Sequence, residues 1–484
     1  MIILYAILVL GVSTIFWSLV GLIRLATEQY VKRIALGPTF GVRVARMLQR
    51  LPFGIAARGL SNGPRSRGGA SSRPLQRSQL QQEHGRHRAR GVRILPANVA
   101  VLIAAHNEAL VISETIRAAA ALVPVRNIHV ISDMSADDTA ALARAAGVKV
   151  LELEANRGKA GALAEGIAHF DLCRKFKVVM LLDADTRPTP DYLETGLPLF
   201  SDPSVVAVAG RARSITTPPP STALGRFLVA YRDRLYVVVQ LLLKYGQAAR
   251  GANVVSIVPG FASMYRTSAL AKIKVLAPGL VIEDFNMTFE IHAKKLGRIA
   301  FHPSAAVAYT QDPDNLQDYI KQVRRWILGF WQTVRRHGLQ AGKFWMVLLL
   351  YMVELVMSCI FFVLLIPVFL LSVVASMQVH NFGGDAQSFV LLSGLLRPQD
   401  VLLGVLIPDF ILSIVAAIAL RRPSLLLMAP LFPLVRILDS VICLMVLPRA
   451  FSTVSSGVWA SPLRRVQGES RELAEATAGA GGPR

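Results

Sequence analysis

The stretch Val178-Val-Met-Leu-Leu-Asp183-Ala-Asp185 predicts the fold of the region around it. Its five apolar residues, two of them β-branched, indicate a short strand that is buried on both faces, as in a parallel sheet. Two carboxylates follow, and open α/β sheets bind ligands outside the carboxyl ends of their strands. Carboxylates at that edge suit a hard divalent cation, which would hold nucleotide phosphates. A lone Asp-x-Asp pair is more often a solvated strand end, so the surrounding sequence has to decide.

Strands and helices alternate around this stretch. Short apolar runs separated by amphipathic segments argue for a parallel sheet with right-handed crossovers, and so for an α/β domain. A later amphipathic segment predicts a helix whose apolar run is too short to cross a membrane. The other predicted strands are 99–104, 128–131 and 148–153, and the predicted helices are 109–122, 137–146, 159–170 and 222–245.

The composition indicates membrane spans. Apolar residues make up 53% of the chain, and the mean hydropathy is +0.46, which exceeds the needs of a soluble globular protein. Residues 1–25 predict a retained N-terminal anchor, and 344–377, 401–420 and 424–447 predict three further crossings. The first of these three is longer than one perpendicular crossing. We therefore expect a bend near Pro367 or a surface portion at its start.

Positive charge is concentrated beside the first span. The net charge is +22, and residues 24–93 hold 15 Lys or Arg against two Glu. Such a stretch typically keeps the adjoining chain in the cytoplasm and attracts anionic lipid. Nucleic-acid binding is the competing interpretation, but no interleaved aromatic residues support it, so we expect no nucleic-acid partner. The three cysteines show neither metal-ligand spacing nor a disulfide framework.

Polar motifs follow the other predicted strands as well. The first strand runs into Ala105-His106-Asn107-Glu108, the second into Ser132-Asp133, and the third into Asn156-Arg-Gly158-Lys159. Because the carboxyl ends of parallel strands meet at one edge of a sheet, these side chains are expected where a nucleotide would lie.

The order of these motifs resembles that of the family 2 glycosyltransferases, whose fold is called GT-A. Three later segments extend the resemblance, which covers roughly 99–332: Val258-Pro-Gly260-Phe-Ala-Ser-Met-Tyr265-Arg266, Ile282-Glu283-Asp284 and Gln322-Val-Arg-Arg325-Trp326. The last matches Gln-x-x-Arg-Trp, the signature of membrane-embedded synthases of cellulose, chitin, hyaluronan and poly-N-acetylglucosamine. One departure is Ser132-Asp133-Met, where the family often has Asp-Asp-Gly.

The resemblance implies a fold and a domain layout. The fold class is a GT-A α/β domain (Rossmann-like, with a mixed, mainly parallel sheet) in the cytoplasm, plus α-helical transmembrane segments. The predicted regions are a transmembrane helix at 1–25, a basic and partly interfacial segment at 26–60, a disordered basic linker at 61–93, the GT-A domain at 94–342, three transmembrane helices at 343–448 and a tail at 449–484.

The resemblance also assigns roles to single residues. On the donor side, Asp185 would hold Mg²⁺ or Mn²⁺ on the diphosphate, with Asp183 close to the ribose or the metal. Asp284 would be the general base that takes the acceptor proton, giving inversion at the anomeric carbon. The remaining assignments are Glu108, Asp133 and Lys159 to the nucleotide sugar, Glu283, Gln322, Arg325 and Trp326 to catalysis, and Gly260, Tyr265, Arg266 and again Trp326 to the acceptor.

Each residue has a structural alternative. The pair Glu283-Asp284 could cap the helix that follows it. Trp326 could be an interfacial anchor and Arg325 part of a basic belt before the spans. Lys159 could be a solvated charge in a first helical turn, and the residues before it could belong to a turn. The motifs favour catalysis only as an ordered set.

Charges inside the predicted spans allow two interpretations. Glu354, Asp409, Arg436 and Asp439 lie in apolar surroundings, where charges usually face a partner or a polar cavity. They could line a conduit for a growing polymer, or form structural ion pairs, with Arg436 and Asp439 paired three residues apart. Neutral variants of Glu354 and Asp409 that make product of full length would contradict the conduit.

These patterns lead to one function and two alternatives. The leading hypothesis is a multi-pass plasma-membrane synthase that extends a polysaccharide from a nucleotide sugar, most simply a UDP-sugar, at the cytoplasmic face. The first alternative is the same chemistry with a single addition to a lipid acceptor. The second is a non-catalytic membrane protein that binds anionic lipid or nucleic acid, for which Asp185→Asn and Asp284→Asn would leave function intact. The sequence leaves the sugar and the oligomeric state open.

Overall fold

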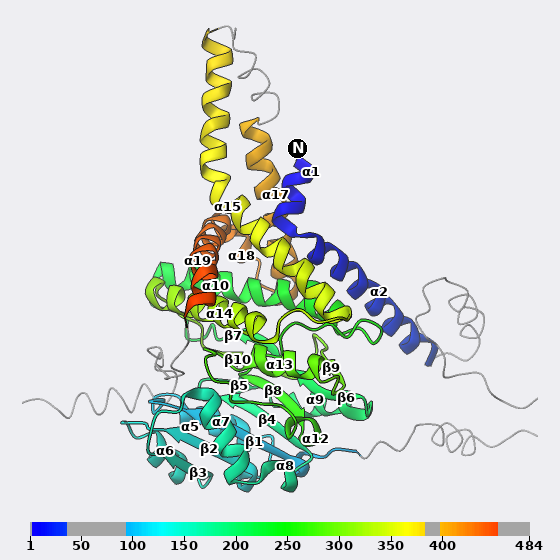
Figure 1. Cartoon of the computed structure of the whole chain (residues 1–484), viewed down its shortest axis with the longest axis vertical. Helices are drawn as coiled ribbons and strands as arrows, with labels where there is room; N and C mark the ends of the chain where they lie inside the picture. The colour runs from blue at the N-terminus through cyan, green and yellow to red at the C-terminus, as the bar shows by residue number, and fades with distance from the viewer. Residues whose placement is uncertain (1, 36–92, 383–396, 454–484) are drawn as a thin grey trace, which may run out of the picture.

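The protein has three layers, which Figure 1 shows stacked along its longest axis. The computed structural model describes residues 2–35, 93–382 and 397–453. An α/β domain forms the base, a layer of helices lies across it, and long apolar helices rise from that layer. Most of the predicted basic segment and linker, and the tail beyond residue 453, lie outside the described residues.

The α/β domain is built on a mixed sheet of seven strands in the order β3-β2-β1-β4-β8-β6-β9. Strands β3, β2, β1 and β4 are parallel, whereas β8 runs antiparallel to both β4 and β6. The strands are β1 Val99–Ala105, β2 Ile128–Asp133, β3 Lys149–Leu153, β4 Val178–Asp183, β6 Val205–Ala209, β8 Ala262–Arg266 and β9 Arg298–Ala300. The predicted strands are therefore present, in a mainly parallel sheet.

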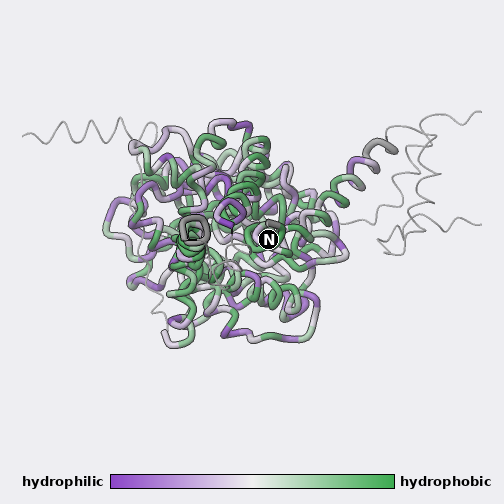
Figure 2. Tube along the Cα trace, turned by 90° about the horizontal axis from the view of Figure 1, so that it is seen from above, coloured by the Kyte–Doolittle hydropathy of each residue, from purple (hydrophilic) through white to green (hydrophobic). Residues whose placement is uncertain are grey.

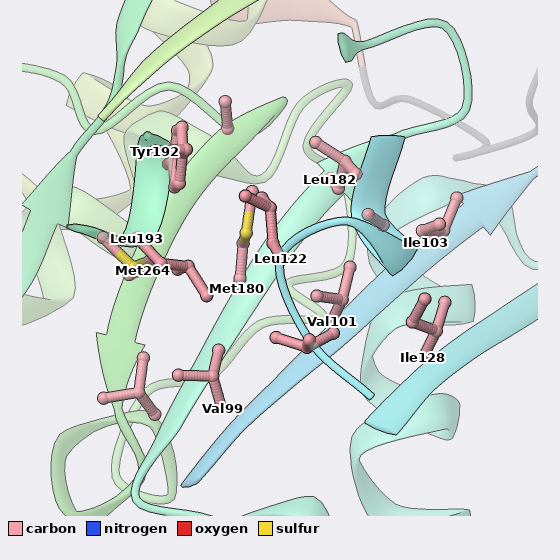
Figure 3. Close-up of a cluster of buried hydrophobic side chains, with 14 of the residues drawn as sticks. Val99, Val101, Ile103, Leu122, Ile128, Met180, Leu182, Tyr192, Leu193 and Met264 are labelled. Carbon is pink, nitrogen blue, oxygen red and sulfur yellow. The ribbon is translucent and has the colours of Figure 1, made fainter. Parts of the chain in front are cut away.

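Alternation along the strands creates a core on each face of the sheet. In β1, Val99, Val101 and Ile103 pack on one face, while Ala100 and Leu102 pack on the other. Figure 3 shows the first of these clusters, in which β1, β2, β4 and β8 contribute side chains to one apolar layer. Helices shield both faces of the sheet from solvent, which explains why the strand sequences are continuous apolar runs.

Helices from the crossovers cover the two faces. α5 (Ile112–Ala120) and α6 (Thr139–Ala145) contribute to one core. α7 (Gly158–His169) and α13 (Asp284–Ala293) contribute to the other. Short helices complete the domain: α8 Leu172–Lys175, α9 Tyr192–Gly196 and α12 Thr267–Leu270. A small second sheet has the order β5-β10-β7, with β5 Arg187–Pro188, β7 Arg211–Ser214 and β10 Val307–Thr310.

Two long helical segments form the middle layer. The predicted helix at 222–245 is α10 (Ala223–Val237), followed without a break by a π-helical stretch at Val238–Lys244 and by α11 (Tyr245–Gln247). The π-helical stretch was not predicted, because its apolar residues also fit an ordinary helix. α14 (Leu316–His337) begins at Asn315, whose side chain accepts a hydrogen bond from the backbone N–H of Asp318.

Among the described residues, three helices are long and apolar enough to cross a membrane, at Lys343–Met377, Pro398–Leu420 and Leu425–Ser452. They correspond to α15 (Lys343–Phe382), α17 (Pro398–Leu420) and α19 (Phe432–Ser452), the last preceded by the short α18 (Leu425–Met428). α15 continues through Pro367. The first turn of α15 packs on the α/β domain, since Phe344 and Trp345 contact Phe289 of α13. α15 therefore has the predicted surface portion at its start and stays helical across Pro367.

The N-terminal segment consists of two helices rather than one. α1 (Ile2–Leu10) and α2 (Val12–Ala35) meet at Gly11 with a bend of 75°, and together they would make a fourth crossing. Gly11 has a φ of +83°, which favours glycine. The side chain of Glu354 accepts the backbone N–H of Ser13 at 3.0 and 3.1 Å, so this intramembrane acid caps the start of α2. Figure 2 shows α2 running out to one side of the helices above the domain.

The other intramembrane charges also have protein partners. Asp409 of α17 forms ion pairs with Arg234 of α10 at 2.8 Å and with Arg436 of α19 at 3.2 Å. Asp439 accepts hydrogen bonds from the hydroxyls of Tyr231 and Tyr319. The predicted pairing of Arg436 with Asp439 is therefore replaced by pairing with Asp409. These contacts join the middle layer to the spans.

Candidate active site

The ends of three neighbouring strands bring the predicted donor-side carboxylates to one edge of the sheet. Glu108 follows β1, Asp133 ends β2, and Asp183 and Asp185 lie at the end of β4. All four are buried or partly buried. The turn after β4 is fixed from below, because the hydroxyl of Thr115 in α5 donates to the carbonyl of Ala184 at 2.6 Å. This edge matches the position where open α/β sheets bind their ligands.

Asp133 orders the start of α7, the helix that carries Lys159. Its Oδ1 accepts the backbone N–H of Arg157 at 2.8 Å, whereas its buried Oδ2 has no hydrogen-bond partner. Burial raises the pKa of the Asp133 carboxyl, against the effect of these backbone N–H groups. His106 bonds through Nδ1 to the carbonyl oxygen of Asp133 at 2.5 Å. A buried carboxylate oxygen without a partner is suited to a ligand that donates a hydrogen bond.

Lys159 connects the end of β4 to the Ile-Glu-Asp motif. Its ammonium Nζ lies 2.6 Å from Asp183 Oδ1 and 2.9 Å from Glu283 Oε1. Burial opposes the charged lysine, but the two carboxylates outweigh it and raise the Lys159 pKa. Burial likewise opposes ionisation of Glu283, yet Lys159 holds the Glu283 pKa below its ordinary value. Glu283 is therefore a paired anion and makes no side-chain helix cap.

Asp284 has the properties required of a general base. Burial, together with the neighbouring negative charge of Glu283, raises the pKa of Asp284 to about 6, although Lys159 partly offsets this. A pKa near the working pH is optimal for taking a proton. Gly260 lies against the same group: a Cβ there would be 2.7 Å from Glu283 Oε1 and 3.1 Å from Lys159 Nζ. Only glycine fits at this position without moving the charges.

The Gln-x-x-Arg-Trp motif lies on α14 with its three side chains on one face. Gln322 and Trp326 are partly buried and Arg325 is exposed. Burial raises the pKa of Glu283, but the charge of Lys159 lowers it, and the charge of Arg325 lowers it further. The same helix holds the loop before α13 close, since Gln332 Oε1 accepts the backbone N–H of Val281 at 3.1 Å. The motif helix and the proposed base are thus packed together.

Of two residues predicted for the acceptor side, Arg266 lies away from the site and Tyr265 is buried beneath it, where the charges of Asp284 and Glu283 add to the effect of burial in raising its pKa. Because β8 is antiparallel to β4, Arg266 pairs in register with Val178, at the opposite end of β4 from Asp183. Its guanidinium donates to the backbone carbonyls of Val205 and Phe200. Tyr265 is fully buried in the core beneath the site. Neither side chain is exposed to an acceptor at the donor edge, whereas Gly260 is part of the site.

Sequence reasoning missed the buried cations of the middle layer, two of which act on residues of the site. Lys244, at the end of the π-helical stretch, is buried, and burial lowers its pKa to about 8 against the attraction of Asp284. Arg232 of α10 is 1% exposed and lies over the Trp326 ring. The sequence signal for Lys244 was a lone lysine after an apolar run. The signal for Arg232 was a charge on the packed face of an amphipathic helix. Each is weak, because such positions are usually solvated or snorkelling charges.

The donor set fits a divalent cation held jointly with a diphosphate. Within residues 2–35, 93–382 and 397–453, no group of three or more His, Cys, Asp or Glu side chains could hold a metal ion. Burial raises the pKa of Asp183, and the charge of Asp185 raises it further. A hard cation would relieve that repulsion, and Mg²⁺ is typically held by one or two carboxylates together with phosphate oxygens. Asp183 and Asp185 therefore fit the predicted metal.

The sheet and the site together define a class of protein. A mixed, mainly parallel sheet whose strand ends gather carboxylates beside the partly buried Asp284 is a glycosyltransferase domain of GT-A type. Residues 96–329 match the family model described as glycosyltransferase like family 2. The fold and the family predicted from the motifs are confirmed.

Relatives with an assigned activity share this domain. The poly-beta-1,6-N-acetyl-D-glucosamine synthase of Staphylococcus epidermidis is 26% identical over 256 residues, covering 49% of this chain and 57% of that protein. The enzyme of the same name from Staphylococcus aureus (strain COL) is 28% identical over 244 residues, covering 49% and 56%. The chain thus spans just over half the length of these relatives. Among solved structures, a mannosyltransferase from Pyrobaculum calidifontis with GDP-Man and Mn²⁺ has a TM-score of 0.43 at 17% identity, covering 74% of this chain and 94% of that one.

Proposed function

We propose that this protein is an inverting glycosyltransferase that extends a polysaccharide from a nucleotide sugar at a membrane. The observation that carries the proposal is the Lys159 bridge, with its ammonium 2.6 Å from Asp183 and 2.9 Å from Glu283. It brings the donor-side strand end and the loop of the base Asp284 into one charge cluster. Group transfer requires both partners to be held together with little freedom.

The donor side accounts for nucleotide binding. The unpartnered Oδ2 of Asp133 would accept a hydrogen bond from the nucleobase, with Glu108 beside it at the end of β1. Asp183 and Asp185 would hold Mg²⁺ or Mn²⁺ on the diphosphate. When bound, such an ion neutralises the charge that develops on the leaving group. Lys159 keeps the neighbouring carboxylates from repelling the diphosphate.

The transfer step follows from the position of Asp284. Its carboxylate takes the proton of the acceptor hydroxyl as that oxygen forms a bond to the anomeric carbon. The bond from the anomeric carbon to the diphosphate breaks, and its electron pair leaves with the nucleotide. Attack opposite the leaving group inverts the configuration. Arg325, exposed on α14, is available to contact the departing diphosphate, and Trp326 to stack against the acceptor sugar.

The relatives support a sugar and a location. Both synthases are named for poly-β-1,6-linked N-acetylglucosamine, which makes UDP-N-acetylglucosamine the first donor to test. The three apolar helices support a multi-pass membrane protein. The Lys and Arg residues that follow the first span support a plasma-membrane orientation with the catalytic domain in the cytoplasm and with anionic lipid at its surface.

A donor panel tests the proposal. Purified protein is incubated with UDP- and GDP-sugars and Mg²⁺ or Mn²⁺, and both released nucleotide and product mass are measured. We expect one donor to be consumed and a ladder of products with a constant mass increment. A single increment on lipid would favour a glycolipid synthase instead. If the unsubstituted protein releases no more nucleotide than the Asp284→Asn variant with any donor, the enzymatic assignment is overturned.

A further inference from the structure

Arg232 makes two direct contacts with the Gln-x-x-Arg-Trp motif. Its guanidinium carbon lies 4.0 Å from the centre of the Trp326 ring, a close cation–π contact. Its Nη2 donates to Gln322 Oε1 at 2.5 Å. Arg232 itself is only 1% exposed. It therefore contacts the acceptor-side residues from behind and is not available to substrate.

The guanidinium is held in turn by a polar group from the small sheet. Arg232 Nε lies 3.5 Å from Asp312 Oδ1, just beyond β10. The same carboxylate accepts hydrogen bonds from the hydroxyl of Tyr236 at 2.8 Å and from that of Ser214 at 2.6 Å. These contacts come from three elements: α10, β7 and the segment after β10. Arg232 is thereby fixed before any substrate arrives, which is the condition for preorganising a site.

The consequence is that one face of the Trp326 ring is covered. An indole has two faces on which a sugar ring could stack, and the guanidinium occupies one of them. The Trp326 side chain remains partly exposed. A planar guanidinium can stack and donate to Gln322 at the same time, whereas a lysine ammonium would do neither equally well.

We propose that Arg232 is a positioning residue that sets the acceptor-stacking face of Trp326. This inference rests on the proposed function, because it assigns Arg232 to the acceptor half of that reaction. Arg232 orients Trp326 and Gln322 and leaves the donor edge unaffected. Loss of Arg232 should therefore weaken acceptor use while donor use is retained.

Arg232→Gln and Arg232→Lys test this with two readouts. The first is the KM for a short β-1,6-linked N-acetylglucosamine oligosaccharide, and the second is the slow release of UDP from UDP-N-acetylglucosamine without acceptor. We expect the acceptor KM to rise about tenfold in Arg232→Gln, since such contacts are worth roughly a factor of ten. Arg232→Lys should restore only part of the loss. UDP release and donor KM should stay within about twofold, as they should in the control Arg226→Gln, an exposed position on the same helix.

A double variant separates positioning from general stability. If Arg232 acts through Trp326, Arg232→Gln should raise the acceptor KM by less than about twofold in a Trp326→Ala background. Multiplicative effects of the two substitutions, or an equal loss of UDP release in Arg232→Gln, would overturn the inference alone. Should Arg232→Gln not fold, the same comparison with Arg232→Lys decides. An unsubstituted enzyme that transfers no sugar would overturn the proposed function and this inference with it.

Discussion

Two parts of this site are built in different ways: the proposed donor edge, at the ends of β2 and β4, and the proposed acceptor layer, which consists of α10, α14 and Asp312. At the donor edge, Asp133, Asp183 and Asp185 come from the ends of β2 and β4, which lie on either side of β1. In the acceptor layer, Trp326 is held by Arg232, which is held by Asp312, and these residues come from separate helices and a small sheet. One half is thus set by strand ends, and the other by side chains that meet only after the chain has folded.

The difference extends to the membrane. Arg234, two residues after Arg232, forms an ion pair with Asp409 in α17 at 2.8 Å, whereas the donor carboxylates lie at the sheet edge. The acceptor layer is therefore continuous with the spans. We expect substitutions at the junction of the two halves to abolish chemistry, and substitutions farther into the helices to have graded effects.

The largest effect is expected at the junction itself. Asp284→Asn removes the proton acceptor, and turnover should fall on the order of 10³-fold, because general-base catalysis contributes roughly 10²–10⁴-fold. Glu290→Gln, on the same helix and paired with Lys294 away from the site, is the matched control. Initial rates of UDP release with acceptor measure both. Asp284→Asn with more than a tenth of normal turnover would mean that another group is the base.

Removal of the bridge between the halves should come next. Lys159→Met leaves Asp183 and Glu283 unpaired beside the diphosphate. We expect kcat/KM for the donor to fall about 10–100-fold, because this range corresponds to the free energy of one or two hydrogen bonds to a charged group. Lys175→Met, an exposed lysine that donates to the carbonyl of Phe170, controls for loss of a positive charge. Equal donor kinetics in the two variants would show that the bridge has only a structural role.

The pH dependence should be smaller, and it reports the state of the base directly. The Asp284 pKa is raised to about 6, and only the ionised form takes a proton, so kcat/KM should fall about tenfold per unit below that pH. Lys159 lowers the pKa of Asp284, so the acid limb in Lys159→Met should move to higher pH. A pH–rate profile of each protein measures this. An acid limb near 4 in the unsubstituted enzyme, or a downward shift in the variant, would exclude Asp284 as the titrating group.

The smallest catalytic effect is expected in the spans. The Glu354 carboxylate accepts the backbone N–H of Ser13 and so caps α2. Glu354→Gln should therefore lower the free energy of unfolding by about 1 kcal/mol, and the melting temperature by roughly 2–4 °C. Product length and turnover should stay within about twofold. Met357→Leu, on the exposed surface of the same helix, is the control for substitution in α15. Shorter product at unchanged melting temperature would favour a conduit role for Glu354.

Prediction from sequence was accurate wherever the signal was local. The alternation of apolar runs predicted the four parallel strands of the main sheet, β1 to β4, and the motifs after them lie at one edge, as expected. The strands β6, β8 and β9 were not predicted. Arg266, predicted for the acceptor side, lies away from Asp183 for a specific reason. β8 runs antiparallel to β4, so the residues before the strand, with Gly260 among them, meet Asp183, and the last residue of the strand lies at the far end. The direction of a strand depends on the strands with which it pairs, and the sequence of the strand itself does not specify them.

The sequence by itself determined the elements and the chemistry available to them: the sheet, the carboxylates at its strand ends, the motif helix and the apolar spans. Periodicity and residue type specify these features, because they depend on contacts within a few residues. Only the tertiary structure decided that Lys159 joins Asp183 to Glu283, that Glu354 caps a bent N-terminal pair, and that Arg232 covers one face of Trp326. Each of these contacts joins residues far apart in the chain, and the packing of whole elements brings them together.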